Sequence, residues 1–213
     1  MPTENERSIY NLDLAYKIAC EQLTKVDIEQ QCRRSGAQYQ VQDSQKTITI
    51  TYLSRSYLIT VPDIDVSLAD STESVPIRDR ILILHYLIQS KGTTASNKLI
   101  TFRELPGGNV YYPTFIKRTM KPLTDNFGRE PDSLVIASKR LGGYETDYGD
   151  TAVTVNAFSR VPITLVLWQG DDEFAPQLNL LFDANISDYL ETEDVTVLCE
   201  TLTWRLIGYL REA

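Results

Sequence analysis

The sequence predicts an α+β fold: a mainly antiparallel sheet, or two small sheets, flanked by helices. Strand-like segments fall into two groups, residues 39–61 and 99–182, and segments of helical periodicity separate and flank them. The longest apolar run, Val161–Trp168, is rich in branched side chains and is typical of a fully buried strand. The segment from residue 192 onward has an apolar helical face, so we expect a C-terminal helix packed on the sheet.

The composition excludes several classes of protein. Of the 213 residues, 42% are hydrophobic, enough for a sizeable core, and the formal net charge is -8. The negative charge argues against nucleic acid and anionic membrane as partners, and leaves a basic protein open. Because no window approaches the roughly 20 apolar residues of a membrane helix, and the N-terminus does not resemble a signal peptide, we expect a cytoplasmic protein. We expect a single domain over residues 1–213, with residues 63–75 as the alternative boundary between two lobes.

The cysteines indicate neither a disulfide framework nor a metal site. Cys20, Cys32 and Cys199 are widely separated and form no CxxC pair. Free cysteines in such surroundings usually behave as small buried hydrophobes. We therefore expect no cofactor and no metal.

Two helices are predicted at the start of the chain. Residues 9–24 form an amphipathic helix capped by Asn11 or Ser8, and a second helix begins at Asp27 and ends at Gly36. The predicted buried face of the first helix consists of Leu12, Ala15, Ile18, Ala19 and Leu23.

From Tyr39 the period changes to two, which predicts three antiparallel strands up to residue 61. Ile48, Ile50 and Tyr52 should face the core. Residues 63–76, acidic and rich in small polar side chains, are the best candidate for a mobile connection.

The next helix begins near Pro76 and is apolar over most of its circumference, so it should lie deep in the domain. It carries the only histidine of the chain, His85. On such a helix a histidine is more often a core or half-buried residue satisfied by one hydrogen bond than a ligand or a catalyst. Burial should then depress its pKa.

A strand over residues 99–104, a turn at residues 106–108 and a helix from about Pro113 follow. A strand, a glycine-rich turn and a helix could hold an anion, but neither GxGxxG nor GxxxxGK[ST] is present, and a simple turn is favoured. Pro122 should kink or break this helix.

Another helix is predicted over residues 131–141, ended by Gly142 and Gly143, followed by a strand over residues 151–158. The central hairpin then pairs residues 161–168 with residues 178–182 across an acidic loop. Thr192 should cap the C-terminal helix, whose buried face includes Leu202.

Several strings resemble the motifs of a known family. They are ILILHYL (81–87), TFRELPGG (101–108), GD (149–150), FSRVPI (158–163), LWQGDDEF (167–174), LFD (181–183) and DYLETED (188–194). Their order, from about Asp27 to Leu206, is similar to that in a family of uncharacterised domains of anaerobic bacteria and archaea. Some members are joined to a cysteine-rich iron–sulfur module, which implies a role in anaerobic one-carbon or redox metabolism. The scattered cysteines of this chain match no such module, so cluster binding is not carried over.

The acidic residues at the hairpin could bind a hard cation or act as an acid/base pair. They are Asp171, Asp172, Glu173 and Asp183, to which an adjoining strand could bring Asp147 and Asp150 near. A solvated turn whose aspartates bond their own backbone is favoured. A return strand of five residues places Asp183 roughly 16 Å from the turn, so we expect Asp183 to cap the following turn at residues 185–187.

Two classes of function remain. The favoured one is a non-catalytic binding or accessory domain that docks a protein partner or a small cofactor; the alternative is a metal-assisted hydrolase or transferase that uses the aspartates. An aromatic-lined groove would favour the first, and at least three converging carboxylates the second. The candidate surface consists of Arg103, Glu104, Gly107, Gly108, Tyr111, Tyr112, Gly142, Gly143, Tyr144, Tyr148, Asp150, Asp171, Asp172 and Glu173. The oligomeric state stays open.

Overall fold

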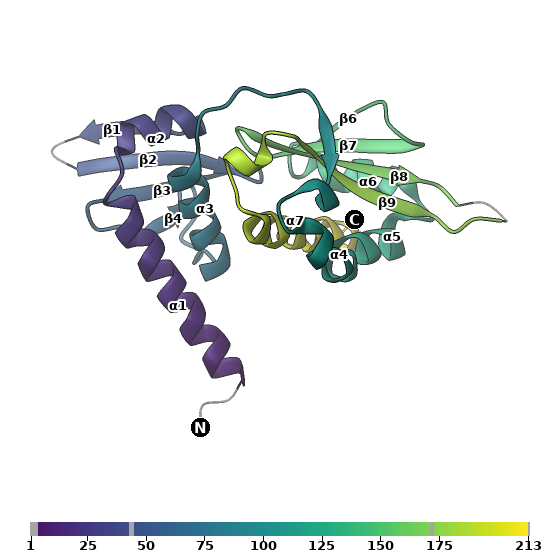
Figure 1. The fold of residues 1–213 in the computed structure, drawn as a ribbon, viewed down its shortest axis with the longest axis horizontal. Coiled ribbons are helices and arrows are strands. Elements are labelled where there is room, and N and C mark those ends of the chain that lie inside the picture. Colours follow the sequence, from purple (N-terminus) through teal and green to yellow (C-terminus); the bar gives the residue numbers. More distant parts are fainter. Residues whose placement is uncertain (1–3, 43–44, 171–172, 213) are drawn as a thin grey trace.

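The computed structural model describes residues 4–42, 45–170 and 173–212, with side chains from residue 11 onward, and confirms the α+β class (Figure 1). Within these residues the strands form one antiparallel sheet in the order β4-β3-β2-β7-β8-β9-β5, with β1 beside β2 and β6 beside β7. The number of domains stays a prediction.

The helices are α1 (Glu4–Leu23), α2 (Ile28–Ser35), α3 (Ile77–Gln89), α4 (Gly108–Phe115), α5 (Lys121–Phe127), α6 (Pro131–Lys139) and α7 (Thr192–Arg211). Short helical turns are η1 (Phe102–Glu104), η2 (Ile116–Met120) and η3 (Ile186–Asp188). The strands are β1 (Gln38–Gln42), β2 (Gln45–Tyr52), β3 (Arg55–Val61), β4 (Val66–Leu68), β5 (Leu99–Thr101), β6 (Tyr144–Glu145), β7 (Thr151–Phe158), β8 (Val161–Trp168) and β9 (Gln177–Asp183).

The predicted cap of α2 is confirmed, whereas the cap of α1 is not. The carboxylate of Asp27 accepts a hydrogen bond from the Gln30 amide, and Gly36 ends α2 in the left-handed conformation. Helix α1 begins at Glu4, so neither Ser8 nor Asn11 caps it. On its predicted buried face Ala19 and Leu23 are fully buried, but Ile18 is 45% exposed.

The predicted meander is confirmed by β1, β2 and β3, and Ile48, Ile50 and Tyr52 are buried. The predicted connection after it is partly a strand. Val66 and Leu68 alternate with polar neighbours, and their burial against β3 makes residues 66–68 the edge strand β4. Only the rest of that segment, up to α3, is without regular structure.

Strand β8 lies at the centre of the second strand group, between β7 and β9, as predicted. The two strand groups lie side by side in Figure 1, and a single residue pair, Tyr52 with Phe158, joins them in the sheet. The rings of that pair stack with centroids 4.8 Å apart. The two strand groups therefore share little backbone pairing, and stacked aromatic rings pack at their junction.

The segment after β5 differs from the prediction in three ways. The strand ends at Thr101, because the Glu104 carboxylate accepts hydrogen bonds from the Thr101 amide and hydroxyl and closes a helical turn. Helix α4 begins at Gly108 rather than near Pro113. Pro122 does not break the helix, because the π-helical turn η2 precedes it and Pro122 lies in the first turn of α5, where its missing N–H is tolerated.

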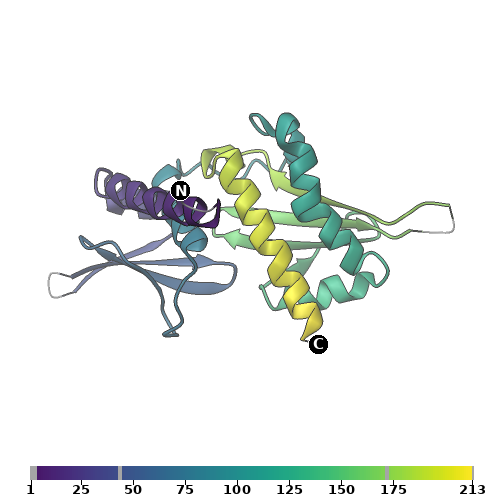
Figure 2. The ribbon, with the colours of Figure 1, turned by 90° about the horizontal axis from the view of Figure 1, so that it is seen from below.

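Helix α7 covers the sheet beside α4 and α5, as Figure 2 shows for the yellow and teal helices. Leu198, Leu202 and Leu206 are fully buried on its inner face. The predicted cap is wrong: Thr192 is the first helical residue, and its hydroxyl donates to the carbonyl of Pro106. No helix in the described ranges is long and apolar enough to cross a membrane.

Helices α3 and α7 run antiparallel, and among the described residues they are joined by three ion pairs, of which two are short. Near the start of α3, Asp79 Oδ2 lies 2.8 Å from Arg205 Nη2. Near its end, His85 Nδ1 lies 2.8 Å from Asp194 Oδ1, in the first turn of α7. The two pairs connect α3, which follows the first strand group, to α7, which covers the second.

His85 is half-buried and has one hydrogen-bond partner, as predicted, but the expected depression of its pKa is wrong. The hydrogen bond to Asp194 outweighs the burial of the ring, and with the nearby acidic charges it raises the pKa of His85 above its ordinary value. The sequence pattern of α3 could not show this, because Asp194 lies more than a hundred residues away in the chain.

The free thiols of Cys32 and Cys199 are buried, as predicted, and Cys20 is half-buried. Burial raises the pKa of Cys32 to about 11 and raises that of Cys199 as well. Both thiols therefore stay protonated at neutral pH and serve as packing groups.

Truncation of Leu202 to alanine should lower the free energy of unfolding by roughly 2 to 5 kcal/mol, because the side chain is fully buried between α7 and the sheet. A urea titration measures this difference. A loss below about 0.5 kcal/mol would show that α7 is peripheral to the core.

The His85–Asp194 pair should stabilise the protein most at mildly acidic pH. Because the folded-state pKa of His85 is raised, its contribution is fully present below the unfolded-state pKa of about 6.5 and is lost as the pH rises through the folded-state value. The loss of unfolding free energy on His85→Asn should be larger at pH 5.5 than at pH 8.5.

The control for this prediction is Lys91→Gln. Lys91 pairs with Asp188 at 2.8 Å, and its hydrogen bond lowers the pKa of Asp188, so this carboxylate stays charged over this pH range. Denaturant titrations of both variants at the two pH values measure the effect. Equal pH dependence in the two variants would contradict a special role for His85.

Candidate functional site

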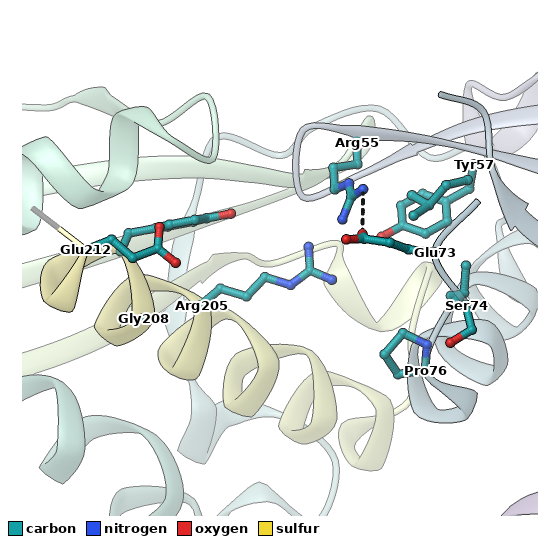
Figure 3. Close-up of a pocket in the computed structure, with 11 residues that line it drawn as sticks. Arg55, Tyr57, Glu73, Ser74, Pro76, Arg205, Gly208 and Glu212 are labelled. Carbon is teal, nitrogen blue, oxygen red and sulfur yellow. Dashed lines mark hydrogen bonds and ion pairs between the residues drawn. The ribbon is translucent and has the colours of Figure 1, made fainter. Parts of the chain in front are cut away.

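A cavity of about 690 Å³ opens where the last turns of α7 face β3 and the segment that leads into α3 (Figure 3). Its lining residues come from distant parts of the chain: Arg55, Tyr57, Leu68, Glu73, Ser74, Val75, Pro76, Arg205, Gly208, Tyr209 and Glu212. Tyr57, Leu68 and Val75 form a buried apolar wall. The opposite wall is the half-buried edge of α7 that carries Arg205, Gly208 and Tyr209.

Arg205 is held firmly at the inner end of the cavity. Its side chain is 22% exposed, and its guanidinium bonds the buried carboxylate of Asp79, which also accepts a hydrogen bond from the hydroxyl of Tyr52. The guanidinium carbon lies 5.3 Å from the centre of the Tyr52 ring. Burial alone would lower the pKa of Arg205, but Tyr52, a hydrogen bond with Tyr57 and the charge of Asp79 raise it. A fixed positive charge thus faces the cavity.

Arg55 supplies a second guanidinium from the start of β3. It lies 3.3 Å from the carboxylate of Glu73 and is more exposed than Arg205, at 40%. In Figure 3 the side chains of Arg55, Glu73 and Arg205 point toward the middle of the cavity. The other acidic lining residue, Glu212, pairs with Arg140 at 3.6 Å.

Gly208 has no conformational reason to be glycine. It lies inside α7, its backbone is helical, and a Cβ atom built on it would meet nothing within 4 Å. Glycine at such a position destabilises a helix by about 0.5–1 kcal/mol relative to alanine. The missing side chain leaves the helix backbone accessible at the cavity, where Figure 3 labels it.

These residues suit the binding of an anion better than covalent chemistry. Guanidinium groups bind carboxylates and phosphates through paired N–H donors. No histidine, lysine or cysteine is present among the described residues that line the cavity. Among these described lining residues the carboxylates are those of Glu73 and Glu212, and both are paired with arginines.

The structure places the candidate surface predicted from the sequence elsewhere, at several separate positions. Around α4, Arg103 stacks on the Tyr112 ring at 4.1 Å, and Tyr111 is 40% exposed. Glu104 closes η1 through its bonds to Thr101. At Gly107 and Gly108 the Gly108 amide donates to the carbonyl of Leu105, so this amide takes part in the turn instead of a cradle.

The remaining candidates lie near β6 and β7. Gly142 and Gly143 end α6, with both amides bonded to its last carbonyls, and Tyr144 is exposed in β6. Asp147, Tyr148 and Asp150 line a hollow of their own, where Asp150 accepts a hydrogen bond from the Gln169 amide. Glu173 lines a further hollow with Gly128 and Phe174. Asp171 and Asp172 lie outside the described residues.

Asp183 caps the turn that follows it, as predicted. It accepts a hydrogen bond from the Asn185 amide, and also from the Ser96 amide and hydroxyl and the Asn97 amide. Burial alone would raise its pKa, but these hydrogen bonds lower it. In the parts of the chain that the structure describes, no group of three His, Cys, Asp or Glu residues is arranged to hold a metal ion.

Reasoning from the sequence missed Arg55, Tyr57, Arg205 and Gly208. Arg205 fits the negative end of a helix and Tyr57 fits the alternation of a strand, so neither residue calls for a further role in the sequence. Gly208 was the signal that the sequence offered for this site. A glycine inside a helix of strong apolar periodicity destabilises that helix, so it suggests a packing or functional role.

Comparison with known proteins gives a family but no activity. No curated protein and no solved structure matches the chain significantly. The sequence model of one family, described as Domain of unknown function (DUF3786), matches residues 27–205. This range agrees with the extent of the resemblance inferred from the motifs, and it contains both Arg55 and Arg205. The chain therefore belongs to the DUF3786 family of domains of unknown function.

Proposed function

We propose that this domain binds a small anionic molecule in the cavity between Arg55 and Arg205, without catalysing a covalent step. The observation that carries this proposal is the convergence of two guanidinium groups, from β3 and α7, on one cavity. A ligand with a carboxylate or phosphate group would bind both.

The fixed position of Arg205 favours affinity. Its partners Asp79 and Tyr57 hold the guanidinium before a ligand arrives, so little side-chain entropy is lost on binding. Arg55, which is more exposed, would adjust to the ligand. One fixed and one adaptable arginine together suit several different ligands, provided that each ligand carries an acidic group.

The shape of the cavity also supports a small ligand. Its volume of about 690 Å³ lies within the usual range of small-molecule sites, roughly 300–1,000 Å³. Leu68, Val75 and Tyr57 would contact the carbon skeleton of the ligand. Gly208 would let the ligand approach the backbone of α7.

Binding without catalysis agrees with the class that the sequence favoured. The alternative, a metal-assisted hydrolase or transferase, depends on Asp171 and Asp172 and stays a prediction. A link to anaerobic one-carbon or redox metabolism, inferred from the family resemblance, also stays a prediction. The ligand class proposed here requires neither.

Succinate and inorganic phosphate are suitable probes, and succinamide is the uncharged control. Isothermal titration should detect binding of at least one anion and none of succinamide. Arg55→Gln should weaken binding at least tenfold, because a charge-assisted pair is lost. Arg33→Gln is the matched control, since Arg33 also pairs with a glutamate on the surface but is not a lining residue. Equal affinities in the two variants would contradict the proposal.

Substitution of Gly208 separates binding from stability. Gly208→Ala should raise the free energy of unfolding by about 0.5–1 kcal/mol, because the position is helical and open. Gly208→Leu should keep at least wild-type stability and yet weaken anion binding more than tenfold by filling the cavity. Urea titration and calorimetry of both variants measure this. Lower stability with unchanged binding would show that Gly208 serves the fold instead.

A further inference from the structure

We infer that Glu73 is an internal competitor for this site: its carboxylate occupies the ligand's place on Arg55, and a ligand carboxylate displaces it. This inference rests on the proposed function and names the ligand class, a small dicarboxylate. Displacement would free residues 70–74, which we call the strap.

The chemistry of the contact identifies the class. Glu73 presents a carboxylate on a short aliphatic stem to the guanidinium of Arg55, 3.3 Å away and beside the cavity (Figure 3). A ligand with the same group would make the same contact. The second carboxylate would then bind Arg205, whose guanidinium points toward the same space from the opposite wall.

The strap is attached to the rest of the protein by that one contact. Within the described residues, its only polar bond to another segment is the Arg55–Glu73 pair, while the Glu73 amide donates inside the strap to the hydroxyl of Ser71. Most of its side chains are exposed. Once the ion pair is broken, these exposed side chains make too little packing contact to hold the strap against the cavity.

Both ends of the strap are anchored. Leu68 and Val75, on either side, are 7% and 5% exposed and belong to the core. The Ala69 amide bonds the carbonyl of Ser56, and the carbonyl of Val75 accepts a hydrogen bond from Arg80. The strap can therefore swing without disturbing β4 or α3, because its movement is limited to the residues between these anchors.

The strength of the contact suits a competitor. Glu73 is 71% exposed, and exposed ion pairs contribute little because water screens them. Competition from Glu73 would therefore lower the affinity of a ligand only about two- to fivefold. A ligand that binds both arginines gains more affinity than it loses to Glu73, whereas a ligand with a single weakly bound carboxylate does not. The competitor thereby selects for ligands with two acidic groups.

The test compares Glu73→Gln with Glu29→Gln. Glu29 is also an exposed glutamate paired with an arginine, Arg33 at 2.6 Å, but it does not line the cavity, so it is a matched control. In isothermal titration with succinate, Glu73→Gln should bind about two- to fivefold more tightly than the wild type, and Glu29→Gln should bind as the wild type does. Equal affinities in all three proteins, or weaker binding by Glu73→Gln, would overturn this inference and leave the proposed function standing.

A second measurement requires no ligand. Backbone ¹⁵N order parameters of residues 71–74 should fall in Glu73→Gln and stay at the wild-type value in Glu29→Gln. Saturating succinate should lower them in the wild type. Unchanged values in Glu73→Gln would show that the ion pair does not hold the strap, whatever the ligand.

The remaining outcomes separate the two proposals. If neither the wild type nor Glu73→Gln binds any anion, the proposed function fails, and the competitor fails with it. If inorganic phosphate binds more tightly than succinate, the proposed function stands and the dicarboxylate class is wrong. Tighter succinate binding together with a mobile strap in Glu73→Gln supports both.

Discussion

The buried ion pair between Asp79 and Arg205 is the interaction on which the arrangement of this protein depends. The Asp79 side chain is only 6% exposed, so removal of Arg205 would leave a buried charge without a partner, at a cost of about 3–5 kcal/mol. The hydroxyl of Tyr52 adds β2 to the same network. One carboxylate thus joins α3, α7 and the sheet, and it also fixes the guanidinium that faces the cavity.

Aromatic stacking supports the same junction. The rings of Tyr57, Tyr52, Phe158, Tyr86 and Tyr189 follow one another with centroids 4.0–6.0 Å apart. This row crosses the place where a single residue pair joins β2 to β7. Large rings bury much area and prefer defined geometries, so they replace the backbone hydrogen bonds that the sheet lacks there. The relative placement of the two strand groups is therefore set by side chains.

Much of the fold could be predicted because its signals are local. The alternation at Ile48, Ile50 and Tyr52, the unbroken run of β8 and the apolar face containing Leu202 each reflect burial of one face of one element. The predictions failed where the state of a residue depends on a partner far away in the chain. Asp194 raises the pKa of His85, and pairing with β3 makes residues 66–68 a strand. The cavity could not be predicted for the same reason, since Arg55 and Arg205 meet only after the helices pack.

The walls of the cavity come from two segments that lie far apart in the chain. Residues 55–76 and 205–212 are brought together only by completed tertiary structure, so an unfolded or partly folded chain has no site to offer. A molecule bound there favours the native state by mass action, by an amount that grows with its concentration relative to Kd. If the proposed anion binds there, the abundance of the folded domain in a cell would follow the supply of that anion.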